Sequence, residues 1–237
     1  MITLHSIVKN EGRFIKAALI SALVSKEVKR ALVWDTGSTD GTVKQILSIK
    51  DKRIEFQQKG NVDRSGLAQL RNQQLKATKT PWILLVDGDE IWPEKNLQNL
   101  VLTIKRCGPE TIALVNKTRN VVGDIYHYLP DSEGHYQIGS WTGHLNIRAI
   151  RNLPGLTVKG EYPDEWYEYE GKKIQEQPEK LEFADIWYLH TTHLKRSDNW
   201  LAELKTVDRL KKHKWFYWLK RIKLNEMSQV EVPDILR

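Results

Sequence analysis

Residues 81–90 have the sequence Pro-Trp-Ile-Leu-Leu-Val-Asp-Gly-Asp-Glu. The apolar run Ile83–Val86 predicts a short strand that is buried on both faces, as the strands of a parallel sheet are. Three carboxylates follow within four residues, and Gly88 allows the backbone to turn sharply between them. Open α/β sheets bind their ligands at the carboxyl ends of such strands. Because neighbouring carboxylates repel one another unless a cation or a protonated partner intervenes, the stretch predicts a site for Mg²⁺ or Mn²⁺; an acidic turn before a helix near Pro93 is the plainer interpretation.

Predicted strands alternate with helices in the first 107 residues. The strands are expected at residues 3–8, 31–34, 53–57 and 82–87, and helices follow the first three. The first helix is expected to begin at Glu11, with Asn10 as its N-cap. Strands that alternate with helices of about ten residues predict a parallel sheet with right-handed crossovers. Residues 1–107 are therefore predicted to form a nucleotide-binding type of α/β half.

The pattern changes after Cys107. Strands with polar or aromatic alternation, more antiparallel in character, are expected at residues 111–117, 120–128 and 143–150, and a last short strand at 186–189. Residues 155–171 form a loop-rich stretch that is dense in acidic and aromatic side chains. Residues 108–196 are thus predicted to be the second half of the same domain. Ser197 is expected to cap a helix that opens a helical extension over residues 197–237.

The composition limits the class of protein. A chain of 237 residues is long enough for one domain with an appendage, and its net charge of +7 favours anionic partners. One cysteine excludes an internal disulfide and a CxxC metal site. The sequence shows neither a signal peptide nor a membrane span, so we expect a soluble cytoplasmic protein. The basic and aromatic segment 211–223 predicts either a helix in peripheral contact with a membrane surface or one packed on the domain.

A second acidic turn, Asp35–Thr42, lies between a predicted strand and a predicted helix and has the sequence DTGSTDGT. Such a turn offers backbone N–H groups and a carboxylate to a ligand at a helix N-terminus. It contains neither the P-loop pattern nor GxGxxG. Taken alone, it is also what ordinary helix capping requires.

Four motifs in this order resemble a family 2 glycosyltransferase of the GT-A fold, over roughly residues 1–125: Ile7–Glu11, Val33–Thr42, Leu70–Asn72 and Leu84–Glu90. The resemblance implies an α/β fold with a Rossmann-like, mostly parallel sheet and an antiparallel extension on the acceptor side. It also implies metal-dependent, inverting transfer of a hexose from a nucleotide-diphosphate sugar, most simply a UDP-sugar. The acceptor would be a hydroxyl of a saccharide, a lipid-linked molecule or a protein, and no nucleic acid is expected as a partner.

The resemblance also implies roles for particular residues. Asp35 matches the carboxylate that holds the nucleotide base, although Thr36 replaces a second aspartate that many relatives carry. Asp87 and Asp89 match the DxD motif, with Asp87 at the ribose and Asp89 meeting the diphosphate through Mn²⁺ or Mg²⁺. Arg71 belongs to an Arg-Asn pair (Asn72 is the second member) that supports the nucleotide pocket.

The remaining candidates lie later in the chain. An inverting enzyme needs a general base on the acceptor side, and the carboxylates of the 161–165 loop are the candidates: Asp164 or Glu165 is favoured, with Glu161 as the third. The plainer interpretation is a solvated acidic loop. The family often closes a late loop on the diphosphate or metal with a histidine, which favours His190 as a metal ligand over His193.

Lys195 and Arg196 come a few residues after the predicted strand at 186–189. Both are candidates for contacts with phosphate oxygens, although a solvated charge pair at the start of a helix explains them equally well.

Two other functions fit parts of the pattern. A nucleotidyltransferase shares the α/β half and the paired aspartates, but it usually carries a glycine-rich loop after its first strand, where this chain has Lys-Asn-Glu-Gly-Arg-Phe at residues 9–14. A non-catalytic module that binds nucleotides or nucleic acid is the other alternative. The carboxylates of Asp35, Asp87 and Asp89 disfavour it, because they would repel a phosphate backbone.

Overall fold

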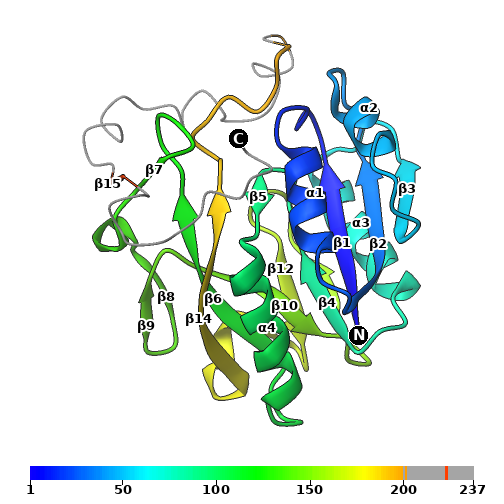
Figure 1. Ribbon diagram of the computed structural model, residues 1–237. Coiled ribbons are helices and arrows are strands. Elements are labelled where there is room, and N and C mark those ends of the chain that lie inside the picture. Colours follow the sequence, from blue (N-terminus) through cyan, green and yellow to red (C-terminus); the bar gives the residue numbers. More distant parts are fainter. Residues whose placement is uncertain (200, 202–221, 224–237) are drawn as a thin grey trace.

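The computed structural model describes residues 1–199, 201 and 222–223, and its centre is an eight-stranded sheet (Figure 1). The strand order is β3-β2-β1-β4-β10-β6-β14-β5. The bounds are β1 Ile2–Val8, β2 Val28–Asp35, β3 Ile54–Gln58, β4 Trp82–Leu85, β5 Glu90–Ile91, β6 Ala113–Asn120, β10 Leu145–Arg151 and β14 Leu181–His190. The sheet therefore continues through both predicted halves.

The first four strands form the parallel part of this sheet. β1 pairs in parallel with β2 and with β4, and β2 pairs in parallel with β3. β4 is buried along its whole length, as its apolar sequence predicts. The register places Val8 opposite Asp35, so both strands end at the same edge. The predicted parallel pairing of these four strands is confirmed.

The second part of the sheet changes direction at β10. This strand runs antiparallel to both β4 and β6, whereas β14 runs parallel to β6 and antiparallel to β5. The carboxyl ends of β1, β4, β6 and β14 consequently lie at one end of the sheet, where their arrows point in Figure 1. The N-terminus lies at the opposite end.

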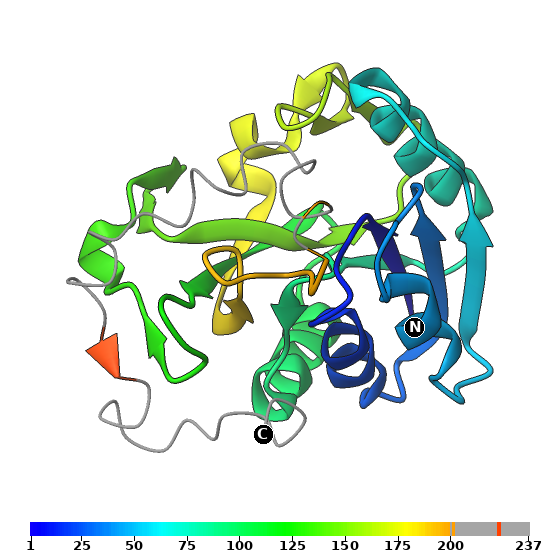
Figure 2. The ribbon, with the colours of Figure 1, turned by 90° about the horizontal axis from the view of Figure 1, so that it is seen from above.

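Helices cover both faces of the sheet, as the view from above shows (Figure 2). Helices α1 (Ile15–Leu23), α2 (Thr42–Leu47) and α4 (Glu94–Arg106) lie on one face. Helix α3 (Arg64–Ala77) lies on the other, beside a small sheet of β11 (Thr157–Lys159), β12 (Trp166–Tyr169) and β13 (Lys172–Lys173). The core has a large cluster on the α1 and α4 side and a second one between the sheet and β11–β12. Short elements complete the described fold: β7 His127–Tyr128, β8 Tyr136–Ile138, β9 Trp141–Gly143, β15 Ile222–Lys223, and 3₁₀ turns η1 Asp131–Glu133, η2 Ile174–Glu176 and η3 Pro178–Lys180.

Two local predictions were wrong. Helix α1 begins at Ile15 instead of Glu11, because Asn10 has a φ of 56° that an N-cap does not adopt. Its side chain instead accepts a hydrogen bond from the backbone N–H of Thr39 at 2.8 Å. The predicted strand over residues 120–128 is also interrupted: β6 ends at Asn120, and the chain turns through Gly123, whose φ is 80°, before the two residues of β7.

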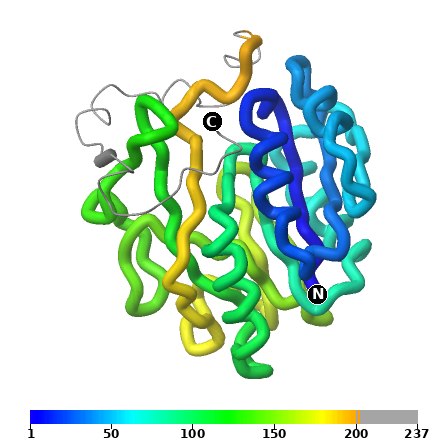
Figure 3. The backbone as a smooth tube through the Cα atoms, viewed as in Figure 1, coloured from blue at the N-terminus to red at the C-terminus, as the bar shows by residue number. Residues whose placement is uncertain are grey.

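The path of the backbone after β14 matters for the site. Residues 191–199 turn away from the end of β14 towards the loop that follows β1, as the tube in Figure 3 shows. The backbone N–H of Arg13 donates to the carbonyl of Arg196 at 3.0 Å and joins the two segments. The chain thereby brings residues 190–196 over the end of the parallel strands.

Most of the predicted extension over residues 197–237 lies outside the described residues, including the helix expected after Ser197. Of the segment 211–223, only Ile222 and Lys223 are described, and they pair as a strand with β7. Peripheral membrane contact by this segment stays a prediction. Among the residues that the structure describes, no helix has the length and apolar character that a membrane crossing requires.

Candidate active site

A cavity of about 310 Å³ lies at the carboxyl ends of the parallel strands. Its walls come from the loop after β1, the first turns of α3, the turn after β4, the 160s loop and the segment after β14. The lining residues that carry charge or hydrogen-bonding groups include Lys9, Glu11, Thr36, Asp63, Arg64, Arg71, Asp87, Asp89, Tyr162, His190, Thr192 and Arg196. Five of the residues predicted from the sequence thus meet around one cavity: Arg71, Asp87, Asp89, His190 and Arg196.

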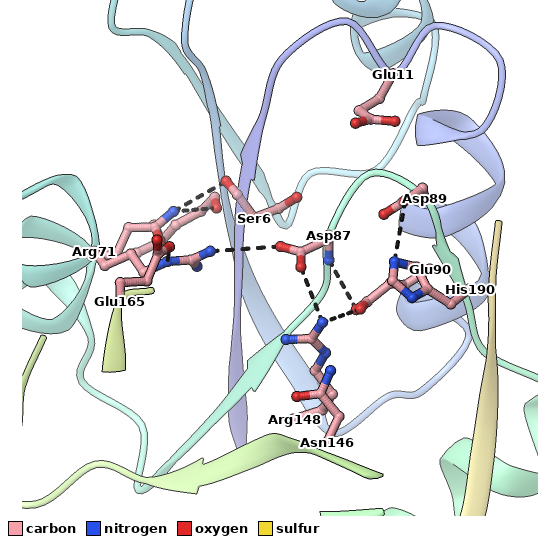
Figure 4. A network of polar contacts seen from close by, with 12 residues as sticks. Ser6, Glu11, Arg71, Asp87, Asp89, Glu90, Asn146, Arg148, Glu165 and His190 are labelled. Atoms are coloured by element: carbon pink, nitrogen blue, oxygen red, sulfur yellow. Dashed lines mark hydrogen bonds and ion pairs between the residues drawn. The ribbon is translucent and has the colours of Figure 1, made fainter. Parts of the chain in front are cut away.

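Asp89 occupies the deepest position among these carboxylates, with 2% of its surface exposed. Its Oδ2 atom lies 2.6 Å from Nη1 of Arg196. The same atom lies 3.3 Å from Nε2 of His190 (Figure 4). The same Arg196 nitrogen lies 3.0 Å from the carboxylate of Glu11. The backbone carbonyl of Asp89 accepts a hydrogen bond from the N–H of Thr191 at 2.9 Å, which fixes the turn after β4 against the end of β14.

Asp87 lies between two guanidinium groups. Its carboxylate is 3.1 Å from Nη2 of Arg148 and 3.8 Å from Nη2 of Arg71 (Figure 4). Its backbone N–H donates to the carboxylate of Glu90 at 3.2 Å, and Glu90 in turn pairs closely with Arg148. Asp87 is therefore held from the side chain and from the backbone at the cavity wall.

Burial shapes the protonation of this network. The carboxylate of Glu90 has no exposed surface, and burial raises its pKa although the nearby charge of Arg148 opposes the rise. Burial alone would lower the pKa of Arg148, but the carboxylates of Glu90 and Asp87 outweigh it and hold that pKa well above the ordinary value. Arg148 consequently stays charged and neutralises part of the acidic cluster.

Arg71 connects Asp87 to the acceptor-side loop. Its Nε donates to Oε1 of Glu165 at 3.0 Å. The other oxygen, Oε2, is buried and has no hydrogen-bond partner among the described residues. Burial would lower the pKa of Arg71, but Tyr167, Asp87 and Glu165 together raise it above its ordinary value.

Other predicted residues have different surroundings. The carboxylate of Asp35 accepts the N–H groups of Gly37 at 3.0 Å and Ser38 at 3.1 Å within its own turn, and Thr36 rather than Asp35 lines the cavity. Asn72 exchanges two hydrogen bonds with the backbone of Val158 and joins α3 to β11.

The remaining candidates lie away from the cavity wall. Glu161 and Asp164 are exposed, and His193 is half-buried. Lys195 lines a separate cavity beside α1. Of the three carboxylates proposed as the base, only Glu165 is joined to the cavity through Arg71.

Sequence reasoning missed Arg148, Tyr162 and the role of Glu11. In the sequence of β10, Leu-Asn-Ile-Arg-Ala-Ile-Arg, polar residues alternate with apolar ones. This alternation was the available signal that Asn146 and Arg148 share one face of the strand. Tyr162 reaches the cavity because its backbone N–H donates to the carbonyl of Arg64 at 3.2 Å. Glu11 gave no signal of its own, because its contact with Arg196 spans 185 residues.

The side chains around Asp89 offer a partial set of ligands for a divalent cation. Within the described residues, no group of three His, Cys, Asp or Glu side chains is placed to hold a metal. Asp89 and His190 form a pair, and their 3.3 Å separation is close to the roughly 3 Å between neighbouring ligands that each lie about 2.1 Å from one cation. Mg²⁺ usually takes one or two carboxylates and completes its shell with water and substrate phosphates. The pair therefore fits a cation that a diphosphate helps to bind.

Two solved structures share the fold of this chain. This chain aligns with the S. aureus TarS 1-349 structure at a TM-score of 0.54 and 17% identity, over 81% of this chain and 60% of that one. It aligns with glucosyl-3-phosphoglycerate synthase from Mycobacterium tuberculosis, in complex with Mn²⁺, UDP and phosphoglyceric acid, at a TM-score of 0.54 and 15% identity, over 89% and 77%. This chain thus spans less than two thirds of the TarS structure. A comparison with curated protein sequences gives no match.

These likenesses establish the fold, which is the GT-A type with a large, mostly parallel sheet. A family profile described as "Glycosyl transferase family 2" matches residues 4–158, which is more than half of the chain. The match includes the turns at Asp35 and at Asp87–Glu90 as well as Arg71. The chain belongs to glycosyl transferase family 2.

Proposed function

We propose that this chain transfers a sugar from a nucleoside-diphosphate sugar to an acceptor hydroxyl with inversion, using Mn²⁺ or Mg²⁺. The observation that carries the proposal is the pairing, in one cavity, of Asp89 and His190 with Arg196. A carboxylate and an imidazole offer ligands to a cation, while the guanidinium offers hydrogen bonds to an anion. A metal-bound diphosphate is a group that needs both.

The donor would bind across the first half of the chain, residues 1–107, and the acceptor would approach from residues 108–196. In this arrangement Asp87 lies where a ribose hydroxyl can donate to it, and its carboxylate is paired with Arg71 and Arg148. The turn at Asp35–Ser38 would form the wall towards the base, with Thr36, which lines the cavity, as its contact. The UDP-GlcNAc complex of TarS and the UDP complex of glucosyl-3-phosphoglycerate synthase support a UDP-sugar as the first donor to test.

The reaction would be a single displacement. The acceptor oxygen forms a bond to the anomeric carbon while the bond from that carbon to the diphosphate oxygen breaks, and the electron pair leaves with the diphosphate. Asp89 and His190 would hold a divalent cation, which would supply Lewis-acid stabilisation of the diphosphate leaving group. Arg196, which lies 2.6 Å from Asp89, would donate further hydrogen bonds to the oxygens of the diphosphate.

The acceptor proton would go to Glu165. Oε1 of this residue is engaged by Arg71, and the buried Oε2 has no hydrogen-bond partner among the described residues. A hydroxyl that donates to Oε2 would satisfy this atom and would be aligned for deprotonation. Asp164 and Glu161 are exposed, so they are less suited to exclude water from the reacting hydroxyl.

The test is a panel of nucleotides and nucleotide sugars, measured by thermal unfolding with and without Mn²⁺ and then by release of nucleoside diphosphate in the presence of simple sugar acceptors. We expect UDP or GDP to raise the melting temperature more with Mn²⁺ than without it. Stabilisation by nucleoside triphosphates alone, with release of pyrophosphate, would favour a nucleotidyltransferase instead. Glu11 argues against that alternative. Its buried carboxylate lines the cavity from the loop after β1, which is where a nucleotidyltransferase would have its phosphate-binding loop, and a carboxylate there would repel the phosphates.

A further inference from the structure

His190 is one end of a chain of hydrogen bonds that leads away from the cavity. Its Nδ1 atom lies 3.2 Å from Oδ1 of Asn120. The amide nitrogen of Asn120 lies 3.1 Å from Nδ1 of His144, and Nε2 of His144 lies 3.1 Å from the carbonyl oxygen of Pro130. The chain thus joins the predicted metal ligand to the loop before η1.

The carbonyl of Pro130, at the far end of this chain, sets the direction of the bonds that lead from His144 to His190. The carbonyl of Pro130 can only accept, so Nε2 of His144 donates, and in the neutral ring Nδ1 is the acceptor. The amide of Asn120 donates to that atom, and its Oδ1 therefore accepts from Nδ1–H of His190. A neutral His190 then carries its lone pair on Nε2, which lies 3.3 Å from Asp89. The carboxylate can only accept, so these two atoms repel each other in the neutral pair, and a cation between them would satisfy both.

The opposite direction is disfavoured. If the Asn120 amide were turned over, its oxygen would face Nδ1 of His144, and both nitrogens of that ring would have to donate. This requires a charged imidazolium, whereas burial lowers the pKa of His144. The environment therefore favours one arrangement of protons along the chain.

The backbone holds these groups in place. Asn120 and His190 are register partners in the parallel pair of β6 and β14. The N–H of Thr118 donates to the carbonyl of His144 at 2.8 Å, and the N–H of Leu129 donates to the carbonyl of Asn120 at 2.9 Å. Both histidines and the amide are therefore carried by paired strand ends and not by free loops.

We propose that Asn120 and His144 are positioning residues: they hold His190 in the tautomer whose Nε2 lone pair, beside Asp89, binds the divalent cation. The inference rests on the proposed function, because it assigns His190 to the metal. Partners that orient a ligand histidine are commonly worth about 10–100-fold in metal affinity. Neither residue is among those that line the cavity, so their effect acts through His190.

The first experiment examines the tautomer without metal. Long-range ¹H–¹⁵N spectra of ¹⁵N-histidine-labelled protein, recorded at a pH where the rings are neutral and assigned with His190→Gln and His144→Gln, report which nitrogen carries the proton. We expect His190 protonated at Nδ1 and His144 protonated at Nε2. Asn120→Leu should change the protonation of His190, whereas Asn120→Asp should retain it, because a carboxylate oxygen still accepts from Nδ1–H. Finding His190 protonated at Nε2 in the wild type would overturn the proposal.

The second experiment measures Mn²⁺ by electron paramagnetic resonance in the presence of UDP or GDP, whichever binds more tightly. We expect a histidine ¹⁵N coupling to Mn²⁺ and a loss of Mn²⁺ affinity of about 10–100-fold in Asn120→Leu. Asn120→Asp should retain the affinity. The matched control is Asn152→Leu, which removes amide hydrogen bonds to Thr78 and Thr80 near the start of β4 and should leave Mn²⁺ affinity unchanged.

The outcomes separate the two claims. Unchanged Mn²⁺ affinity in Asn120→Leu, with the histidine coupling present in the wild type, would overturn the positioning role and leave the proposed function intact. A wild type that binds Mn²⁺ with the nucleotide but lacks any histidine coupling would overturn the role of His190 and the positioning role together. The tautomer spectra do not depend on metal, so they identify which step of the argument fails.

Discussion

The guanidinium of Arg71 lies 3.0 Å from the carboxylate of Glu165, although 94 residues separate the two in the chain. The same guanidinium extends towards Asp87 at 3.8 Å. One side chain of α3 therefore contacts both the turn after β4 and the loop before β12. In the proposed reaction these are the two places where charge changes, at the leaving group and at the base.

The first prediction concerns Glu165. Glu165→Gln should lower kcat by about 10²–10⁴-fold with little change in the KM for the donor, because the amide keeps the contact with Arg71 but cannot take a proton. Asp164→Asn and Glu161→Gln serve as controls and should retain most of the turnover. Steady-state kinetics with the acceptor decide it: a large loss in Asp164→Asn, with Glu165→Gln active, would move the base to Asp164.

The second prediction concerns the buried pair of Arg148 and Glu90. Arg148→Met leaves the carboxylate of Glu90 without its cation in a fully buried position, which should reduce the free energy of unfolding by about 3–5 kcal/mol. Adding Glu90→Gln to the same chain should recover a large part of that loss. Urea denaturation measures both.

A surface pair provides the control for this measurement. Lys117 and Asp185 form an exposed ion pair at 2.8 Å, and Lys117→Met should cost less than about 1 kcal/mol. If Arg148→Met were no more costly than Lys117→Met, the buried network would not contribute to stability as described.

The third prediction concerns the pH dependence of stability. Burial, with smaller contributions from Arg71 and Arg30, lowers the pKa of His5 from 6.5 to about 3. Between these two values the unfolded chain binds a proton at His5 and the folded chain does not, so the free energy of unfolding falls as the pH decreases below about 6.5. The slope from this residue approaches about 1.4 kcal/mol per pH unit.

His5→Gln should make that slope shallower, even though the substitution also lowers stability at neutral pH. The exposed His135→Gln should leave the slope as in the wild type. Urea unfolding from pH 7 to pH 4.5 gives the comparison. Parallel curves for the wild type and His5→Gln would contradict the assignment.

The fourth prediction concerns the turn at Asp35. Because its carboxylate holds the N–H groups of Gly37 and Ser38, Asp35→Asn should distort the wall of the cavity and weaken nucleoside diphosphate binding by about 1–3 kcal/mol. The loss of affinity should be equal with and without Mn²⁺, because Asp35 is not one of the two predicted metal ligands, Asp89 and His190. Asp51→Asn, which lies next to Arg53 away from the cavity, is the control. A loss seen only with Mn²⁺ would show that Asp35 acts on the metal.

The sequence was sufficient for the parallel half of the fold because its signals are local. Each apolar strand and each helix that follows carries its own periodicity, so β1 to β4 and the carboxylates at their ends were predicted from short windows. Helix α1 was predicted four residues too early because the left-handed backbone of Asn10 depends on its contact with Thr39. That contact joins two segments 29 residues apart, and a local pattern does not report it.

The rest of the site depends on strand order. β10 lies antiparallel between β4 and β6, and this placement brings Arg148 to Glu90 and His144 to Asn120. No spacing in the sequence specifies which strand a late segment will pair with. For the same reason the sequence left Asp164 and Glu165 as equal candidates, whereas the fold exposes one and pairs the other with Arg71.

The most direct test of the account is calorimetric titration of UDP and GDP, with and without Mn²⁺, into the wild type and Asp89→Asn. The account predicts that Mn²⁺ raises the affinity of the wild type for one of these nucleotides by about tenfold or more, which corresponds to about 1.4 kcal/mol. It predicts that Asp89→Asn loses this increase while the variant stays folded by circular dichroism. A full Mn²⁺-dependent increase in Asp89→Asn would contradict the central claim that Asp89 binds the metal of a nucleotide-sugar donor.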